Sequence, residues 1–324
     1  MKSSLYISVF FVYIFMSCSY NLFANNIAVS SISLTGRNTS TQTLRVQFSL
    51  SWDNSWRTTS APFNWDAAWV FVKYKVGATG DWKHATLATS GHTIPSGAST
   101  TQNDATGLFI YRSGVGTGTF SPSAIQLIWN YGTDGVPNDS KITVRVYAIE
   151  MVYHPPGGYQ AGSGAINNGE FRRANDVTAT APASTFTITG TTPTLQGNSS
   201  AASPTNLGAY NNTYTDLTGT STASLATGFP TGFNSFYAMK YEISQQQYVD
   251  FLNTLTYSQQ ASRTVAAPSS SPGTAALSSG NANRNGIDIQ TSGIPSTQPA
   301  VYACNLNRSE EHTSELQSRQ YLVC

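Results

Sequence analysis

The 324-residue chain carries 17 Lys and Arg against 16 Asp and Glu, a net charge of +1, and only 10% of its residues are charged. Globular proteins average about 25% charged residues, so the polar surface must come from Ser, Thr, Asn and Gln, as is common in exported β-rich proteins. The near-neutral balance gives no electrostatic basis for binding nucleic acid or an anionic membrane. The length has room for about two domains.

The N-terminus has the layout of a signal peptide. Lys2 precedes an apolar run at residues 5–16, which is shorter than the ~20 residues that span a bilayer. We therefore expect an exported protein, periplasmic, cell-surface or secreted and not transmembrane, with residues 1–24 removed by cleavage after Ala24. Lipidation at Cys18 is the alternative, which Phe15 three positions earlier disfavours.

Residues 25–150 predict an antiparallel β-sandwich domain. Apolar and polar residues alternate over 44–51, as in a strand with one face in water. The same theme, rich in Val and aromatic residues, recurs at 67–76, 108–111, 125–131 and 142–147. A sandwich follows because each half-buried sheet needs a second layer over its apolar face.

Residues 236–255 combine an extended lead-in with a helix. The lead-in alternates up to Ile243, which suits a short strand with one packed face. Ser244 is a good N-cap, and Gln247 three residues on completes a capping box. Four apolar residues follow at helical spacing and predict a buried face: Tyr248, Phe251, Leu252 and Leu255.

An earlier segment, 151–164, runs from a strand end through Pro155, Pro156, Gly157 and Gly158 into a tight turn. Regions rich in Thr, Ser, Ala and Gly at 176–231 and 258–297 have few large apolar residues. They predict exposed loops or poorly ordered excursions.

The two segments together resemble the formylglycine-generating enzyme (sulfatase-modifying factor) family. Its domain opens with a phrase like M-V-x-I-P-G-G-x-F-x-M-G, and here Tyr159 replaces the Phe and Ala161 the second Met. The residues similar to this phrase are Met151, Val152, Pro156, Gly157, Gly158, Tyr159 and Gly162. The residues that match the family's strand and helix, F-x-M-x-K-Y-E-V-T and Q-Y-x-x-F-L, are Phe236, Met239, Lys240, Tyr241, Glu242, Ile243, Ser244, Gln247, Tyr248, Phe251 and Leu252.

This resemblance implies that residues 151–307 are the N-terminal part of an α+β, C-type-lectin-like domain with long loops. In the family, paired cysteines in the second half of the domain bind copper and oxidise a cysteine of a client protein, and related branches use an iron-binding half. Neither metal set can be assigned to this chain, so we expect no catalytic, cofactor-binding or metal residues and no activity from the chain as it stands.

The C-terminal residues 308–324 differ in character from the rest of the chain. Residues 308–318, RSEEHTSELQS, resemble the in-frame translation of a short-read sequencing adapter, and four charged residues fall within eight positions. We expect this tail to be artefactual and the native sequence to depart from the given one after Asn307, in which case the family resemblance is truncated.

Other candidate residues give weak signals. His84, His92 and His154 have no His, Cys or Glu at metal-ligand spacing, which favours surface or turn positions. Cys304 has no base nearby in sequence and is expected to pack as a small hydrophobe.

The six tryptophans all lie in the N-terminal half, at Trp52, Trp56, Trp65, Trp69, Trp82 and Trp129. Most tryptophans in small sandwiches are core residues, but exposed ones could stack against sugar rings. Two hypotheses therefore stand: a truncated family member, or a secreted or cell-surface module that binds a glycan or a protein. The oligomeric state stays open.

Overall fold

The structure is a computed structural model that describes residues 26–161, 171–173, 186–191, 194–196, 206–209, 222–224, 230–277, 286–305 and 321–323. It forms two compact units. The first takes in the described parts of Met1–Ser55, Ala68–Ile149 and Tyr241–Cys324, and the second Trp56–Ala67 with the described parts of Glu150–Lys240. The predicted leader, Cys18 included, lies outside the described residues, as do residues 308–320 and 324 of the predicted tail.

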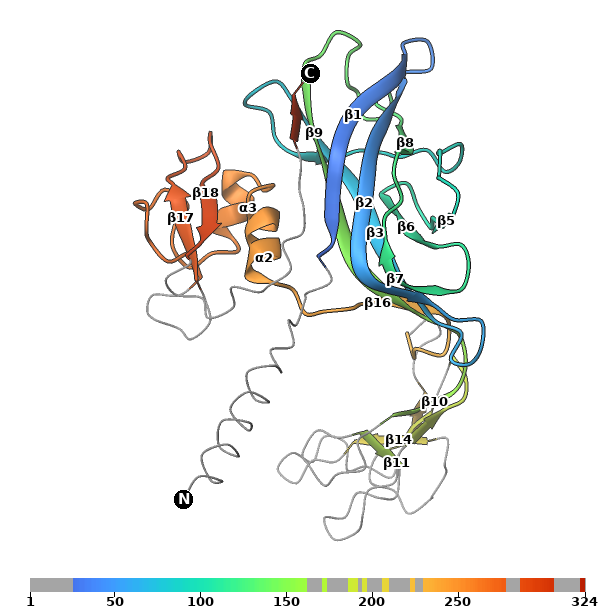
Figure 1. Cartoon of the computed structure of the whole chain (residues 1–324). Coiled ribbons are helices and arrows are strands. Elements are labelled where there is room, and N and C mark those ends of the chain that lie inside the picture. Colours follow the sequence, from blue (N-terminus) through green and yellow to red (C-terminus); the bar gives the residue numbers. More distant parts are fainter. Residues whose placement is uncertain are drawn as a thin grey trace, which may run out of the picture. The chain divides into compact units, whose positions relative to one another are not determined.

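The described residues before 155 form nine strands, most of which are labelled in Figure 1. They are β1 (Ala28–Asn38), β2 (Thr43–Arg57), β3 (Trp65–Val76), β4 (Lys83–His84), β5 (Ala98–Thr101), β6 (Gly107–Arg112), β7 (Gly116–Phe120), β8 (Ile125–Trp129) and β9 (Ile142–His154). In one layer β2 lies between β1 and the pair β7 and β8, and in the other the order is β5, β6, β3, β9, with β4 paired to β3.

The predicted strands at 44–51, 67–76, 108–111, 125–131 and 142–147 correspond to β2, β3, β6, β8 and β9. The antiparallel, β-rich character expected for this part of the chain is confirmed. β1, β4, β5 and β7 are additional. The domain boundaries and the lectin-like classification stay predictions.

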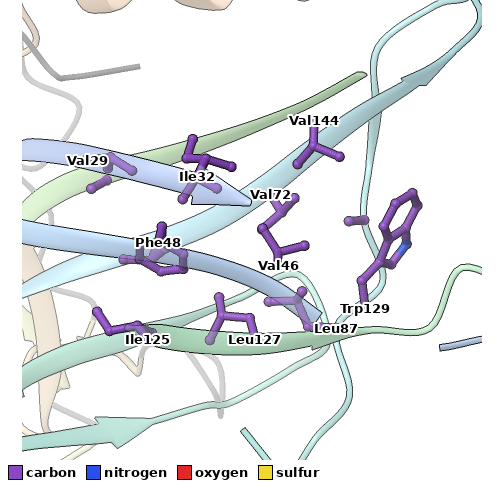
Figure 2. Packing of buried hydrophobic residues seen from close by; sticks show 14 of the residues in the cluster. Val29, Ile32, Val46, Phe48, Val72, Leu87, Ile125, Leu127, Trp129 and Val144 are labelled. Carbon is purple, nitrogen blue, oxygen red and sulfur yellow. The ribbon is translucent and has the colours of Figure 1, made fainter. Parts of the chain in front are cut away.

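The buried faces of both layers share one core. Alternate residues of β2, among them Val46 and Phe48, are fully buried, because successive side chains of a strand point to opposite faces. They pack with Val72 of β3, Val144 of β9 and Leu127 of β8. Figure 2 shows these side chains between the strands. Each Å² of apolar surface removed from water contributes about 25 cal/mol to stability. This core is therefore the main stabilising element of the first unit.

The second unit holds mostly short strands. They are β10 (Tyr159–Ala161), β11 (Phe171–Arg173), β12 (Phe186–Ile188), β13 (Thr194–Gln196), β14 (Asn206–Ala209), β15 (Thr222–Ser224) and β16 (Phe236–Met239). β10 pairs with β12, and β11, β14, β13 and β15 form a small sheet. The expectation of loops throughout 176–231 is therefore wrong for β12 to β15.

The described residues within 244–305 form a small α+β module. Its elements are α2 (Gln245–Leu252), α3 (Tyr257–Ala261), β17 (Ile287–Thr291) and β18 (Val301–Cys304), with β17 and β18 antiparallel. The predicted capping box is present: Gln247 N–H donates to Ser244 Oγ at 3.2 Å, and Ser244 N–H donates to Gln247 Oε1 at 2.8 Å. Thr256 and Gln259 repeat the motif at α3.

The predicted buried face of α2 is wrong in one residue. Leu252 is fully buried, but Phe251 is 40% exposed, and Val249 takes its place in the core. Tyr248 and Leu255 are half-buried against that core. The helix therefore meets β18 through a side rotated away from Phe251. The lead-in also differs, because β16 ends at Met239 and Ile243 is exposed.

Two side-chain amides hydrogen-bond to backbone groups of β18 and of Ala300 just before it, as a neighbouring strand would. Gln260, fully buried on α3, donates from Nε2 to the carbonyl oxygens of Leu252 and Ala300 and accepts from Ala300 N–H at 2.8 Å. Asn253 donates to the carbonyl of Tyr302 and accepts from its N–H. These bonds satisfy buried backbone groups that would otherwise be costly. Within the described residues, no helix has the length and apolar character to cross a bilayer.

Candidate functional site

The outer face of the layer containing β3, β6 and β9 is aromatic. Since Val70 and Val72 of β3 point into the core, Trp69 and Phe71 at the alternate positions lie on the opposite face. On β6 and β9, too, alternate residues point into the core, so Phe109, Tyr111 and Tyr147 lie on the opposite face. We call the resulting group the aromatic face, and its members are Trp69, Phe71, Phe109, Tyr111 and Tyr147.

The rings of the aromatic face pack across the strands. Trp69 and Phe109 have centroids 4.6 Å apart, and Phe71 stacks on Tyr147 at 5.1 Å with 13° between the planes. Gly107 makes room for the indole, because a Cβ there would lie 2.6 Å from Cζ2 of Trp69. Phe109 and Tyr147 are buried in this packing, while Trp69 and Phe71 keep part of their surface in solvent.

The charged groups on the same side of β3 and β9 are basic. Lys73 and Lys75 follow Phe71 on β3, and Arg145 precedes Tyr147 on β9. The Arg145 guanidinium lies 4.0 Å from the ring centroid of Trp82, and the Lys75 ammonium lies 5.5 Å from it, within the range of a cation–π contact.

Burial changes the titration of this region. It lowers the pKa of the Lys73 ammonium. His84 keeps much of its surface in solvent, yet its ring lies 5.4 Å from Phe71, and partial desolvation together with the charge of Lys73 lowers its pKa. Desolvation disfavours the charged form of both groups, and repulsion from the like charge of Lys73 adds to the effect on His84. His84 is therefore neutral at pH 7, and the positive charge of the face comes from lysine and arginine.

The tryptophans divide into two groups. Trp52 and Trp129 are fully buried, as expected for core residues, and Trp129 Nε1 donates to Asp134 Oδ2 at 2.5 Å. The half-buried ones are Trp56, Trp65, Trp69 and Trp82. Trp69, which lies on the outer side of β3, therefore departs from the expectation that tryptophans of a small sandwich are core residues.

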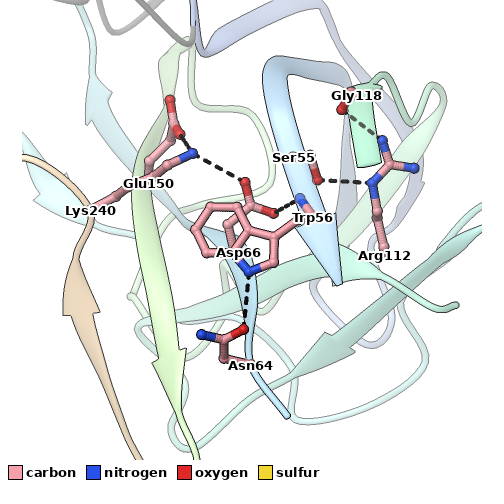
Figure 3. Close-up of polar contacts among 8 residues, drawn as sticks. All are labelled: Ser55, Trp56, Asn64, Asp66, Arg112, Gly118, Glu150 and Lys240. Carbon is pink, nitrogen blue, oxygen red and sulfur yellow. Dashed lines mark hydrogen bonds and ion pairs between the residues drawn. The ribbon is translucent and has the colours of Figure 1, made fainter. Parts of the chain in front are cut away.

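A buried ion cluster lies in the second unit (Figure 3). Lys240 Nζ is 3.1 Å from Glu150 Oε2 and 3.4 Å from Asp66 Oδ2, and the Lys240 side chain is only 11% exposed. Both carboxylates are buried. Asp66 Oδ1 also accepts the backbone N–H of Trp56 at 3.0 Å, and the ammonium lies 4.8 Å from the Trp56 ring centroid. We call Asp66, Glu150 and Lys240 the ion cluster.

The ion cluster joins the two segments that carry the family resemblance. β16 pairs antiparallel with the end of β9, with Met239 opposite Met151 and Phe236 opposite His154. Lys240 N–H continues this pairing by donating to the carbonyl of Glu150 at 3.0 Å. Segments about eighty residues apart in sequence thus lie side by side, held by backbone bonds and by buried charge.

A second aromatic group in the same unit is engaged in packing. Trp65 stacks on Tyr153 at 3.8 Å with 10° between the planes, and the Arg57 guanidinium lies 4.7 Å from its ring centroid. Trp65 Nε1 donates to the Tyr237 hydroxyl at 3.3 Å. Through these contacts the Trp65 indole of β3 connects β9 with β16.

The residues weighed as metal or nucleophilic candidates are not brought together. His84 and His154 are exposed, as expected, whereas His92 is partly buried, and its Nδ1 accepts the N–H of Ile128 at 3.0 Å. Cys304 is half-buried against the module core, as expected of a small hydrophobe. In the described part of the chain no three His, Cys, Asp or Glu residues are grouped as a metal site.

Comparison of the chain with protein-family models, with curated proteins and with solved structures found no match.

Proposed function

We propose that the protein is an exported binding protein whose aromatic face holds a carbohydrate, and that the carbohydrate is acidic. The observation that carries the proposal is the chemistry of the outer sheet face. An antiparallel sheet with one face in water normally shows polar residues there, but β3 presents Trp69 and Phe71 followed by two lysines.

The chemistry of such a surface suits a charged sugar polymer. A pyranose ring has an apolar face of C–H groups that can lie on an aromatic ring, and Trp and Phe supply large rigid contact areas. Lys73, Lys75 and Arg145 lie on the same side of the sheet and would pair with carboxylate or sulfate groups. These side chains offer contact surface and charge for binding, whereas bond cleavage would also need positioned acids and bases.

Affinity electrophoresis of the full chain tests this function. Gels would contain polygalacturonate, its fully methyl-esterified form, alginate or no polysaccharide. We expect retardation in the acidic polymers that weakens as salt rises, because exposed charge pairs are screened, and less retardation in the ester. Unchanged mobility in every gel would contradict the proposal.

A second proposal concerns residues 151–305. Their resemblance to the front part of a formylglycine-generating-enzyme-like domain is supported by the pairing of Met151 with Met239 and by the capping box that starts α2. On this proposal the native coding sequence continues beyond Asn307 into the rest of that domain, and the cysteine-oxidising chemistry would belong there. A long-read assembly in which the frame runs natively through residues 308–318 would contradict it.

A further inference from the structure

A cavity of about 290 Å³ lies where the hairpin of β1 and β2 meets the loop between β8 and β9, all within the first unit. An apolar cavity of about 150 Å³ accommodates benzene, so this one has room for a ring or branched chain with a short extension. Its apolar lining residues are Leu34, Leu44, Tyr131, Val136 and Ile142.

The walls of the cavity are held by the rest of the fold. All the apolar lining residues except Leu34 are buried members of the sandwich core, and Leu34 packs against it. The Tyr131 hydroxyl donates to Asn138 Oδ1 at 2.7 Å, and Gly132 N–H donates to the carbonyl of Gln42 at 3.1 Å, which joins the loop to the hairpin. A preformed site of this kind loses little free energy to ordering when a ligand binds.

The C-terminal strand takes no part in the cavity. β19 (Tyr321–Val323) pairs with β9 from Thr143 onward, and none of its residues is among the described lining residues. The cavity is therefore built without the tail that we expect to be artefactual.

A β-bulge in β1 places Arg37 on the cavity side of the hairpin. Thr35 pairs with Arg45 and Asn38 with Thr43, so β1 has one extra residue here, and Gly36 and Arg37 together stand opposite the core-facing Leu44. Gly36 has a φ of +56°, which favours glycine. Bulges of this kind redirect a side chain, and Arg37 lines the cavity although regular alternation from Leu34 would point it away.

Arg37 brings a positive charge with donors to spare. Within the described residues its side chain makes no ion pair, and its one hydrogen bond runs from Nη1 to the carbonyl of Asn138 at 2.9 Å. A guanidinium has five N–H donors and stays charged. The described lining residues include no Asp or Glu, since Asp139 lies between two of them in sequence but does not line the cavity.

We propose that this cavity binds a small carboxylic acid with an aromatic or branched aliphatic body. The body lies among the apolar residues, and the carboxylate pairs with the Arg37 guanidinium, whose planar fork suits two parallel hydrogen bonds. Apolar walls with a few convergent polar groups are typical of small-molecule sites. The site is separate from the carbohydrate surface, because no residue of the aromatic face lines it.

A ligand-observed NMR titration of the full chain tests the proposal. The probe is hydrocinnamate, and hydrocinnamyl alcohol is its uncharged counterpart. A ligand of this size should bind with a dissociation constant on the order of 100 µM. We expect the alcohol to bind about tenfold more weakly, because it lacks the charge-assisted bonds to Arg37.

Two variants separate the charge from the cavity. Arg37→Gln should weaken hydrocinnamate about tenfold and leave the alcohol unchanged. Arg263→Gln is the matched control, because Arg263 is also exposed, also donates to a backbone carbonyl and does not line the cavity. Val136→Phe adds a ring to the lining and should weaken both ligands. Circular dichroism melts check that each variant is folded, and the exposed Arg37→Gln decides if Val136→Phe is not.

Hydrogen exchange locates the bound acid. Amides of residues 131–142 should exchange more slowly when hydrocinnamate is bound. Four outcomes would overturn the proposal: no saturable binding at millimolar concentrations, equal affinity for acid and alcohol, unchanged acid binding in a folded Arg37→Gln variant, or protection confined to other residues. Because none of these measurements uses a polysaccharide, they leave the carbohydrate proposal to its own test.

Discussion

Replacing Lys240 with Met should destabilise the second unit strongly. Methionine has a similar length but no charge, so the change leaves the buried carboxylates of Asp66 and Glu150 facing each other. The Lys240 Nζ lies 3.1 Å from Glu150 and 3.4 Å from Asp66, and its side chain is 11% exposed. Breaking a buried ion pair by removing one partner costs about 3–5 kcal/mol, and the Lys240→Met variant should lose a similar amount.

Most of this loss in stability comes from the buried carboxylate charges that no longer have the Lys240 ammonium beside them. The net attraction within the ion pair accounts for less of it. The triple variant Asp66→Asn, Glu150→Gln, Lys240→Met removes all three charges. Replacing a whole buried ionic group is often close to neutral, so the triple variant should be more stable than the single one. Lys83→Met is the matched control, because Lys83 is exposed and surface changes usually stay within about 0.5 kcal/mol.

Urea unfolding followed by tryptophan fluorescence measures these differences. Trp56, whose ring centroid lies 4.8 Å from the Lys240 ammonium, reports directly on the cluster. The loss in the Lys240→Met variant should persist at high salt, since buried pairs are weakly screened. A loss of about 1 kcal/mol or less would refute the reasoning, because that is the size expected of an exposed pair.

Three further predictions concern the first unit. Leu252→Ala should cost about 2–5 kcal/mol because Leu252 is fully buried, and Phe251→Ala about 1 kcal/mol or less because Phe251 is 40% exposed; thermal unfolding of this adjacent pair checks it. Gln260→Leu should cost about 3 kcal/mol or more in the same assay, because three hydrogen bonds to buried backbone groups are lost. The pKa of His92 is lowered mainly by burial, so its stabilising effect should be complete above the usual value of about 6.5 and be lost as pH falls below it. A His92→Gln variant should show a flatter dependence of unfolding free energy on pH between about 7 and 5, and an unchanged slope would contradict this.

Strands with strict alternation could be predicted from sequence, and the shortest ones could not. The pattern around Val46 and Phe48 fixes both the strand and its buried face. β4, with two residues, and β5, with four polar or small residues, carry no such pattern. Their pairing depends on neighbours supplied by the fold.

The aromatic face was open to prediction in part. Residues 68–72 are apolar at both parities, which indicates a strand with two apolar faces and not one. That signal on β3 points to Trp69 and Phe71. The arrangement with Phe109 and Tyr147 depends on strand order, which local sequence does not encode.

The ion cluster and the face of α2 show two physical limits of sequence reasoning. Asp66, Glu150 and Lys240 are separated by more than eighty residues each, so no local pattern brings them together. On α2, Phe251 fits an apolar stripe as well as Val249 does, and the choice is made by how the helix meets β18. Tertiary packing decides such cases over local periodicity.

The most direct test of the proposed carbohydrate site is affinity electrophoresis of Trp69→Ala beside the unchanged protein. Val115→Ala is the matched control, since Val115 is an exposed apolar residue outside the aromatic face. With melting temperatures recorded for all three proteins, we predict that Trp69→Ala loses most of the retardation in acidic polysaccharide while Val115→Ala keeps it. Equal retardation of a folded Trp69→Ala variant and the unchanged protein would contradict the account.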